Sequence, residues 1–149
     1  MTASFREAVE SDVDALIPYI RKLYAQDLIV FEEQIVRAGL IGLIEDGSKG
    51  KVWMIRDGEQ TVGYAVLTYG YSLEFHGRDA FLDELFVSEE HRGRGIGRQT
   101  VQFLLGECRK TGVHAIHLEV DRSNEKAQEL YRKLGFFDHD RYLMTKWLP

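Results

Sequence analysis

Hydrophobic side chains in the first part of the chain recur at helical spacing. An extended run from Ala3 to Val9 comes first, and Ser11 or Asp12 can then cap a helix. The apolar positions of that helix recur three and four residues apart, at Val13, Leu16, Ile17, Ile20 and Leu23/Tyr24. A second helix is expected from Glu32 to Ile44, with Ile35, Leu40 and Leu43/Ile44 facing inward, although two glycines lower its helix propensity.

The remainder of the chain predicts a mixed sheet. The runs Lys51–Arg56 and Thr61–Leu67 flank an Asp-Gly turn, which indicates an antiparallel hairpin, and a third strand is expected from Ala80 to Val87. The pattern then alternates between helix and strand, with a helix from Ile96 to Lys110, a strand from Val113 to Val120, a helix from Asn124 to Leu134 and a strand from Tyr142 to Leu148. This order predicts one α/β (α+β) domain over residues 1–149, with helices on both faces of the sheet.

Composition narrows the functional classes. With 149 residues, 44% hydrophobic and 29% charged, the chain has the balance of one globular domain. No apolar run approaches the ~18 residues of a membrane span, and the N-terminus does not have the pattern of a secretory signal. Cys108 is the only cysteine, so we expect no internal disulfide, no cysteine-rich metal site and a cytoplasmic location. The net charge of −5 argues against general nucleic-acid binding and suits a cationic substrate.

The segment Arg92-Gly93-Arg94-Gly95-Ile96-Gly97 lies between an apolar strand and an amphipathic helix. Glycines allow a ligand to approach the backbone, and the first N–H groups of a helix attract anions. Arg92, Arg94 and Arg98 add positive charge that suits phosphate, although a turn with solvated arginines would have the same sequence. The spacing matches neither a dinucleotide-binding fingerprint nor a P-loop.

This loop resembles the coenzyme A signature of the GNAT acyltransferases. The signature is Arg92-x-x-Gly95-x-Gly97, preceded by Asp83-Glu84-Leu85-Phe86-Val87, and the later run Leu118-Glu119-Val120, Asn124 and Leu130 to Phe136 is similar to the next block of the family. The resemblance extends from about Phe81 to Phe137, whereas residues 1–50 match only in their strand–helix–helix order. It implies a mostly antiparallel sheet of six to seven strands, splayed between strands 4 and 5 and flanked by about four helices. It further implies acetyl-CoA as co-substrate, no metal and, as in other members, a possible homodimer.

The resemblance assigns roles residue by residue. The pyrophosphate would be held by the loop and helix start, namely Arg92, Gly93, Arg94, Gly95, Ile96, Gly97 and Arg98. The pantetheine arm would pair with the backbone of Leu85, Phe86 and Val87 and contact Asn124. An N–H near Phe86 or Val87 would stabilise the thioester oxyanion. Tyr131 would lie near the sulfur, where it is our candidate for the acid that protonates the thiolate.

The base that deprotonates the acceptor amine is left open by the sequence. A lysine-like amine, with a reference pKa of about 10.4, must lose a proton before it attacks. The candidates are Glu84 or Asp83 in the strand before the loop, Glu119, and water alone. For the acceptor, the acidic and aromatic residues Tyr24, Asp27, Phe31, Glu32, Glu33, Tyr71 and Glu74 favour a small cationic amine. A protein or peptide acceptor and a non-catalytic acyl-CoA sensor are the alternatives.

Overall fold

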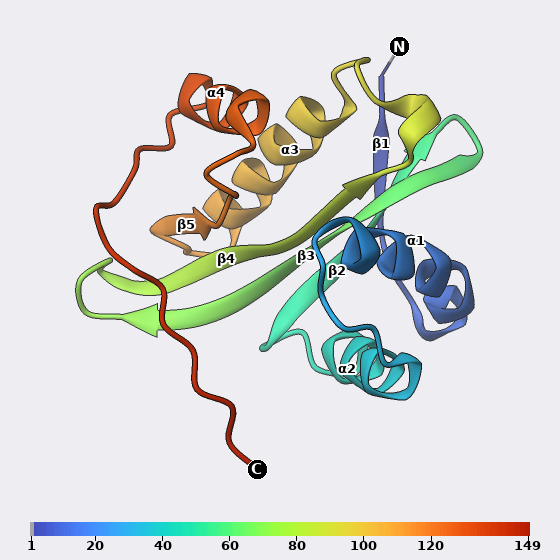
Figure 1. The fold of residues 1–149 in the computed structure, drawn as a ribbon, viewed down its shortest axis with the longest axis horizontal. Coiled ribbons are helices and arrows are strands. Elements are labelled where there is room, and N and C mark those ends of the chain that lie inside the picture. Colours follow the sequence, from blue (N-terminus) through green and yellow to red (C-terminus); the bar gives the residue numbers. More distant parts are fainter. Residues whose placement is uncertain (1) are drawn as a thin grey trace. The chain divides into compact units, whose positions relative to one another are not determined.

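The computed structural model describes residues 2–149, which divide into two compact units after Glu119. The first unit contains β1 (Ser4–Glu7), α1 (Val13–Gln26), α2 (Glu33–Glu45), β2 (Gly50–Asp57), β3 (Gln60–Ser72), β4 (Gly77–Val87), α3 (Ile96–Lys110) and β5 (Ala115–Leu118), with short 3₁₀ turns η1 (Glu10–Asp12) and η2 (Glu89–His91) (Figure 1). The second unit contains α4 (Glu125–Lys133). The sequence-based assignment of one domain to residues 1–149 stays a prediction.

The sheet has the order β1-β2-β3-β4-β5. Neighbouring strands are antiparallel except β4 and β5, which are parallel, so the predicted mixed and mostly antiparallel arrangement is confirmed. The predicted number of six to seven strands is wrong, because the described residues form a sheet of five.

The expected strand from Tyr142 to Leu148 does not form. Residues 142–148 have no regular secondary structure, and several large apolar side chains in this segment are exposed, namely Tyr142, Leu143, Met144, Trp147 and Leu148. A strand is stable only where its backbone N–H and C=O groups find partners on a neighbouring strand. A β-type residue pattern does not supply that partner.

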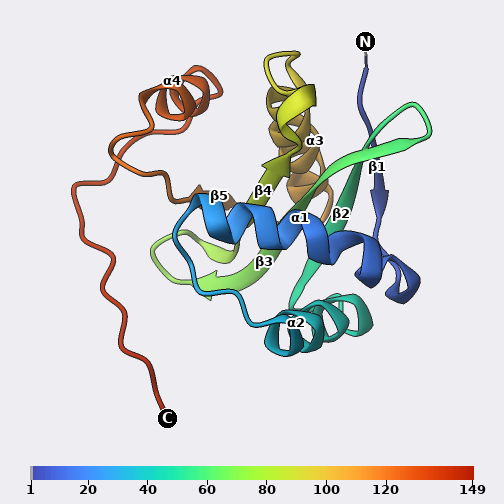
Figure 2. The same cartoon turned by 45° about the vertical axis from the view of Figure 1, so that its right-hand side comes forward.

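Opposite faces of the sheet are covered by different helices (Figures 1 and 2). Helices α1 and α2 bury one face, where Leu16, Ile20 and Leu40 join a core with Val52, Met54, Tyr64, Val66 and Phe86. Helix α3 covers the other face through Ile96, which packs with Ile55 and Val62, and through Phe103, whose ring stacks on Phe5 at 4.4 Å. The predicted inward positions of α1 are confirmed. In α2, Ile35 is exposed and Val36 packs inward instead.

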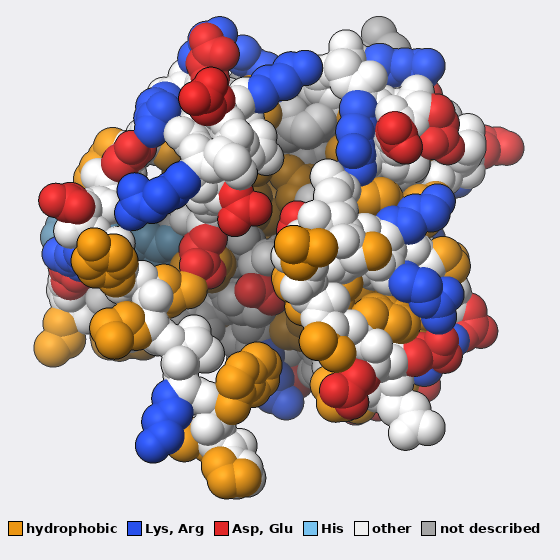
Figure 3. Space-filling view, viewed as in Figure 1, with side chains coloured by type: hydrophobic (Ala, Val, Ile, Leu, Met, Phe, Trp, Pro, Cys, Tyr) orange, Lys and Arg blue, Asp and Glu red, His pale blue; other side chains and the backbone are white. Residues whose placement is uncertain are grey.

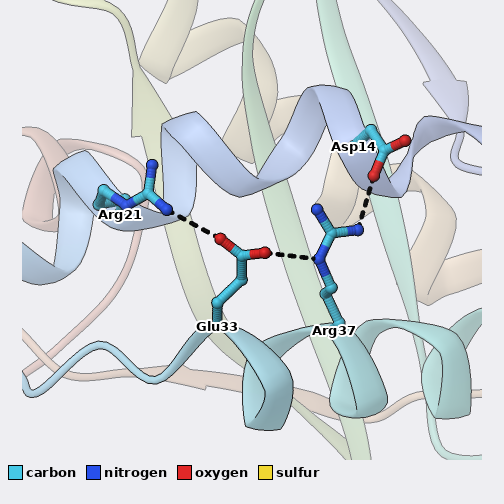
Figure 4. Close-up of polar contacts among 4 residues, drawn as sticks. All are labelled: Asp14, Arg21, Glu33 and Arg37. Atoms are coloured by element: carbon cyan, nitrogen blue, oxygen red, sulfur yellow. Dashed lines mark hydrogen bonds and ion pairs between the residues drawn. The ribbon is translucent and has the colours of Figure 1, made fainter.

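Helices α1 and α2 are linked by a chain of exposed ion pairs (Figure 4). Glu33 contacts Arg21 at 2.9 Å and Arg37 at 3.0 Å, and Arg37 also contacts Asp14 at 2.6 Å. Exposed pairs contribute little to stability individually. They connect Glu33 and Arg37 of α2 to Arg21 and Asp14 of α1. On the face shown in Figure 3, acidic and basic side chains are interspersed.

In the second unit, Asn124 caps α4 by accepting the Ala127 N–H at 3.2 Å. Gly135 follows the helix with a φ of 96°, the left-handed conformation expected at a helix C-terminus. Four side chains along this helix and its C-terminus are half-buried, namely Ala127, Leu130, Tyr131 and Leu134. None of the helices within residues 2–149 is long and apolar enough to cross a membrane.

Candidate active site

Strand β4 runs past its parallel neighbour. β5 pairs with β4 only from Asp79 to Leu82, opposite Ala115 to Leu118. The rest of β4, up to Val87, pairs with β3 alone. Across the described residues, the backbone of β4 beyond Leu82 has no strand partner on the β5 side. The point after Leu82 at which β4 and β5 part, which we call the fork, confirms the expected splay between strands 4 and 5.

The backbone of Val87 faces the open side of the fork. The next N–H along the chain, that of Ser88, donates to the Val62 carbonyl on the β3 side at 2.8 Å. Successive backbone groups of an extended strand point to opposite edges, so those of Val87 point away from β3. Consistent with this geometry, the Val87 carbonyl accepts from Arg92 Nε at 2.8 Å. The Val87 N–H can therefore donate a hydrogen bond to a carbonyl oxygen of a ligand that lies along the open edge of β4.

The glycine-rich loop after β4 ends at an uncapped helix N-terminus. Gly93 and Gly95 have φ values of 76° and 80°, a left-handed conformation that favours glycine. Gly95 is the N-cap of α3, no side chain caps the helix, and the first backbone bond runs from the Gln99 N–H to the Gly95 carbonyl. The N–H groups of Ile96, Gly97 and Arg98 therefore have no partner within the helix. A Cβ on Gly97 would meet nothing within 4 Å, so the cradle is open to an anion.

The three arginines of this loop behave differently. Arg92 is held by the protein, since its Nη2 donates to Gln26 Oε1 at 3.1 Å and its guanidinium lies 5.3 Å from the centre of the Phe86 ring. Arg94 and Arg98 are exposed and make no hydrogen bond or ion pair within residues 2–149. Arg92 thus ties the loop to β4 and to the end of α1, and Arg94 and Arg98 remain available to phosphate oxygens.

The two candidate carboxylates of β4, Asp83 and Glu84, lie at a β-bulge. Val66 pairs with Glu84 and the next residue of β3, Leu67, pairs with Leu82, so Asp83 is an extra residue directly beyond the fork. Asp83 is exposed and makes no hydrogen bond or ion pair to the described residues, but the surrounding protein desolvates its carboxyl group and raises its pKa. The regular alternation of side chains between the two faces of a strand does not apply at this position.

Glu84 is held by two tyrosines on the α1 side of the sheet. Tyr64 donates to Oε1 at 2.7 Å and Tyr24 donates to Oε2 at 2.8 Å. Burial raises the pKa of Glu84, and the two hydrogen bonds oppose that rise. Burial and the neighbouring Glu84 carboxylate also raise the pKa of both phenols, which therefore remain donors. This arrangement provides a fixed carboxylate with an elevated proton affinity, as a general base at neutral pH requires.

Comparison with known proteins identifies the family. The family model described as "Acetyltransferase (GNAT) family" matches residues 17–136. The chain belongs to the GNAT acetyltransferase family. A relative named thialysine N-epsilon-acetyltransferase from Bos taurus is 28% identical over 146 residues, covering 89% of this chain and 83% of the relative. The L-methionine sulfoximine/L-methionine sulfone acetyltransferase of Pseudomonas aeruginosa is 25% identical over 150 residues, covering 91% and 81%.

A solved structure has the same fold. An integron cassette protein from the mobile metagenome of Cole Harbour Salt Marsh aligns with a TM-score of 0.85 and 28% sequence identity, covering 97% of this chain and 90% of that protein. The GNAT membership shows that the protein is an acyl-CoA-dependent N-acetyltransferase. The uncapped N-terminus of α3 and the free edge of β4 fit the phosphate and amide groups of such a substrate.

Three candidate residues of this GNAT enzyme lie at or beyond the boundary of the first unit. Glu119 directly follows β5 and is exposed, without a hydrogen bond or ion pair to residues 2–149. Asn124 and Tyr131 belong to the second unit, where the Tyr131 ring packs edge-on against Phe136 at 5.8 Å. Burial raises the pKa of the Tyr131 phenol, which keeps it protonated. Their roles in pantetheine binding and proton transfer stay predictions.

Sequence reasoning missed the partners of Glu84. The sequence places Tyr24 only among the candidates for the acceptor site and Tyr64 only within a predicted strand. Both hydrogen bonds depend on tertiary placement, since Tyr24 and Tyr64 are 60 and 20 positions from Glu84 along the chain. The available signal was the single carboxylate expected on the buried face of an apolar strand, because such a group requires hydrogen-bond donors.

Proposed function

We propose that this protein transfers the acetyl group of acetyl-CoA to a primary amine of a small cationic metabolite. The supporting observation is the free edge of β4, which leads from the fork directly to the uncapped N-terminus of α3. One continuous track thus offers N–H groups to pyrophosphate oxygens, to the pantetheine amides and, where the pantetheine arm ends, one N–H to the thioester oxygen. The amine attacks the thioester carbon in a ternary complex, and the developing negative charge on the oxygen is stabilised by that N–H.

We assign the base to Glu84, acting directly or through water. Its position in β4, two residues beyond the fork, and its elevated pKa support this choice over Glu119. Glu119 is exposed and makes no hydrogen bond or ion pair within residues 2–149, so no such contact holds its carboxylate in one orientation. Asp83 is adjacent and also has a raised pKa, so it is the alternative that the variants must test. Tyr131 is proposed as the acid that protonates the departing thiolate.

The acceptor is proposed to approach over the α1 side of the sheet. Tyr24 packs edge-on against Phe31 at 6.0 Å and supplies an aromatic surface beside Glu84. Glu33, one of the acidic residues expected near the acceptor, forms ion pairs with Arg21 and Arg37 and therefore contributes little net negative charge there. Recognition of a cation in this region would instead depend on carboxylates that are not paired with arginine.

The test is acetyl-CoA turnover measured by free-thiol release with polyamines, aminoglycosides, amino acids and short peptides. We expect turnover with at least one small cationic amine and none with peptides. Turnover with peptides alone would replace the small-molecule acceptor by a protein acceptor. Coenzyme A binding without turnover on any amine would favour a sensor. The cytoplasmic location and the homodimer stay predictions, the latter to be checked by light scattering.

The base assignment is tested with Glu84→Gln and Asp83→Asn, which remove one charge each at adjacent positions. We expect Glu84→Gln to lower kcat and to abolish the acid limb of the pH–rate profile, and Asp83→Asn to retain that limb. The opposite pattern would transfer the role to Asp83. An unchanged limb in both variants would favour water alone or Glu119.

A further inference from the structure

The last turn of α1 is attached at two points to the segment that runs from β4 into the glycine-rich loop. Tyr24 donates its phenolic hydrogen to Glu84 Oε2 at 2.8 Å, and Gln26 Oε1 accepts from Arg92 Nη2 at 3.1 Å. Arg92 is itself fixed, because its Nε donates to the Val87 carbonyl at 2.8 Å. One attachment therefore holds the proposed base, and the other, two residues along the helix, holds the start of the coenzyme A loop.

The turn that ends α1 is strained. The Ile29 N–H donates to the Tyr24 carbonyl at 2.8 Å, and the Leu28 N–H to the Ala25 carbonyl at 3.4 Å. These two bonds form a Schellman motif, in which the left-handed position is usually glycine. Here that position is Leu28, with a φ of 57° and a side chain that is 93% exposed, so burial does not offset the strain. Such a conformation persists only where surrounding contacts hold it.

Each attachment supports the other. Tyr24 and Gln26 lie on one hydrogen-bonded turn, so a shift of that turn moves both side chains. A turn released from Glu84 would no longer hold Gln26 against Arg92. Arg92 immediately precedes the glycines that lead to the first N–H groups of α3, and a loop fixed before its ligand arrives loses less entropy on binding.

We propose that Gln26 is a positioning residue that couples the coenzyme A loop to the Tyr24–Glu84 hydrogen bond. Through Arg92 it holds the loop in its binding conformation, and through the last turn of α1 it holds Tyr24 against Glu84. Coenzyme A binding and the orientation of Glu84 therefore stabilise each other, since coupling between two sites is reciprocal. The inference rests on the proposed function only in treating Glu84 as the base.

A double-mutant cycle on coenzyme A affinity, measured by calorimetry, tests this coupling without any turnover. Tyr24→Phe removes a hydroxyl that bonds to Glu84 and not to the loop, and we expect it to raise the Kd of coenzyme A about threefold, the scale of one hydrogen bond. Gln26→Ala should raise the Kd by a similar factor, and adding Tyr24→Phe to it should have no further effect. Gln26→Glu keeps an acceptor for Arg92, so in that background Tyr24→Phe should again weaken binding.

The matched control is Tyr19→Phe, which removes the same hydroxyl from α1 at a position where it donates to the Thr61 carbonyl. It should leave the Kd unchanged in the wild-type and Gln26→Ala backgrounds. Additive effects of Tyr24→Phe and Gln26→Ala, or an unchanged Kd in either single variant, would overturn the proposal. A rise in Tyr19→Phe equal to that in Tyr24→Phe would do the same.

The pH–rate profile supplies a second readout, which a merely structural role of Gln26 would not move. The titratable groups that face Glu84 come from α1, β3 and β4, namely Tyr24, Asp27, Tyr64 and Asp83. Loss of the Tyr24 hydrogen bond raises the pKa of Glu84, because a donor to the ionised form is removed. Gln26→Ala should therefore move the acid limb to higher pH, as Tyr24→Phe does, although Gln26 does not bond to Glu84.

An acid limb at the wild-type pH in Gln26→Ala would contradict the coupling. If no amine is acetylated, the proposed function fails separately, and the binding cycle still decides. A Tyr24→Phe effect that disappears in Gln26→Ala upholds the coupling, and one that persists refutes it.

Discussion

Tyr64 donates its phenolic hydrogen to Glu84 Oε1 across β3 and β4, with 2.7 Å between the two oxygens. Tyr64 is fully buried, and Glu84 is the half-buried carboxylate two residues beyond the fork. Burial raises the pKa of Glu84, and the hydrogen bonds from Tyr64 and Tyr24 hold that rise back. The tyrosines therefore set both the position and the proton affinity of the proposed base.

Replacing Tyr64 with Phe should raise the pKa of Glu84 further, because one donor to the ionised form is lost. The acid limb of the pH–rate profile should move to higher pH, and the free energy of unfolding should fall by about 1 kcal/mol. Tyr19→Phe is the matched control, since the Tyr19 hydroxyl donates to the Thr61 carbonyl and not to Glu84. It should lose a similar stability without moving the limb. A shift of equal size in both variants would contradict the link between Tyr64 and Glu84.

Glu84→Gln should become more stable relative to the wild type as pH rises. The folded state holds the Glu84 proton more tightly than the unfolded state does, because its folded pKa is raised. Wild-type stability therefore falls as pH rises from the unfolded pKa of about 4.3 through the raised folded value. Glutamine does not titrate and avoids that loss. Thermal unfolding of both proteins at pH 4 and pH 8 measures how the stability difference between them changes with pH. The altered hydrogen bonds shift that difference by a similar amount at both pH values and do not affect the comparison.

The opposite sign is expected for Asp46→Asn. Hydrogen bonds from the Ser48 side chain and backbone lower the pKa of Asp46, so its contribution is present above the unfolded pKa and lost as pH falls through the folded one. Asp46→Asn should thus lose stability relative to the wild type at pH 8 and regain parity in acid. The same direction of change in both variants would show that the trend does not come from these two groups.

Gly95→Ala should weaken coenzyme A binding and lower stability. Its φ of 80° is strained for alanine, at a cost of about 1 kcal/mol, and relaxing the strain would turn the first N–H groups of α3 away from the ligand. Gly106→Ala, in the interior of the same helix with nothing within 4 Å of the new methyl group, should raise stability by about 0.5–1 kcal/mol. Calorimetry should show an unchanged coenzyme A affinity for Gly106→Ala. Equal affinities for all three proteins would remove Gly95 from the binding loop.

Tyr131→Phe should lower kcat more than it lowers the affinity for coenzyme A. The phenol stays protonated because burial raises its pKa, and phenylalanine keeps the ring that packs against Phe136. Tyr142→Phe removes the same hydroxyl from an exposed position of the second unit and should leave turnover unchanged. Wild-type kcat in Tyr131→Phe would exclude this residue as the acid.

The sequence by itself determined the helices, the hairpin and the position of the anion-binding loop. Each depends on local rules: the three-to-four-residue apolar repeat of α1 and α3, the Asp-Gly turn, and glycines in the left-handed conformation before a helix. The same local rules failed where pairing decides the outcome. Residues 142–148 have the pattern of a strand and form none, because no neighbouring strand satisfies their backbone.

Only the tertiary structure decided which side chains meet. The bulge at Asp83 changes the alternation of β4, so the face on which each carboxylate lies could not be read from its position in the sequence. Glu84 acquires its donors from α1 and β3, and Asp79 acquires His117 from β5, 38 positions away. The reason is physical: an amphipathic pattern specifies that a side chain is buried, whereas its hydrogen-bond partner is set by strand register and by how helices pack on the sheet.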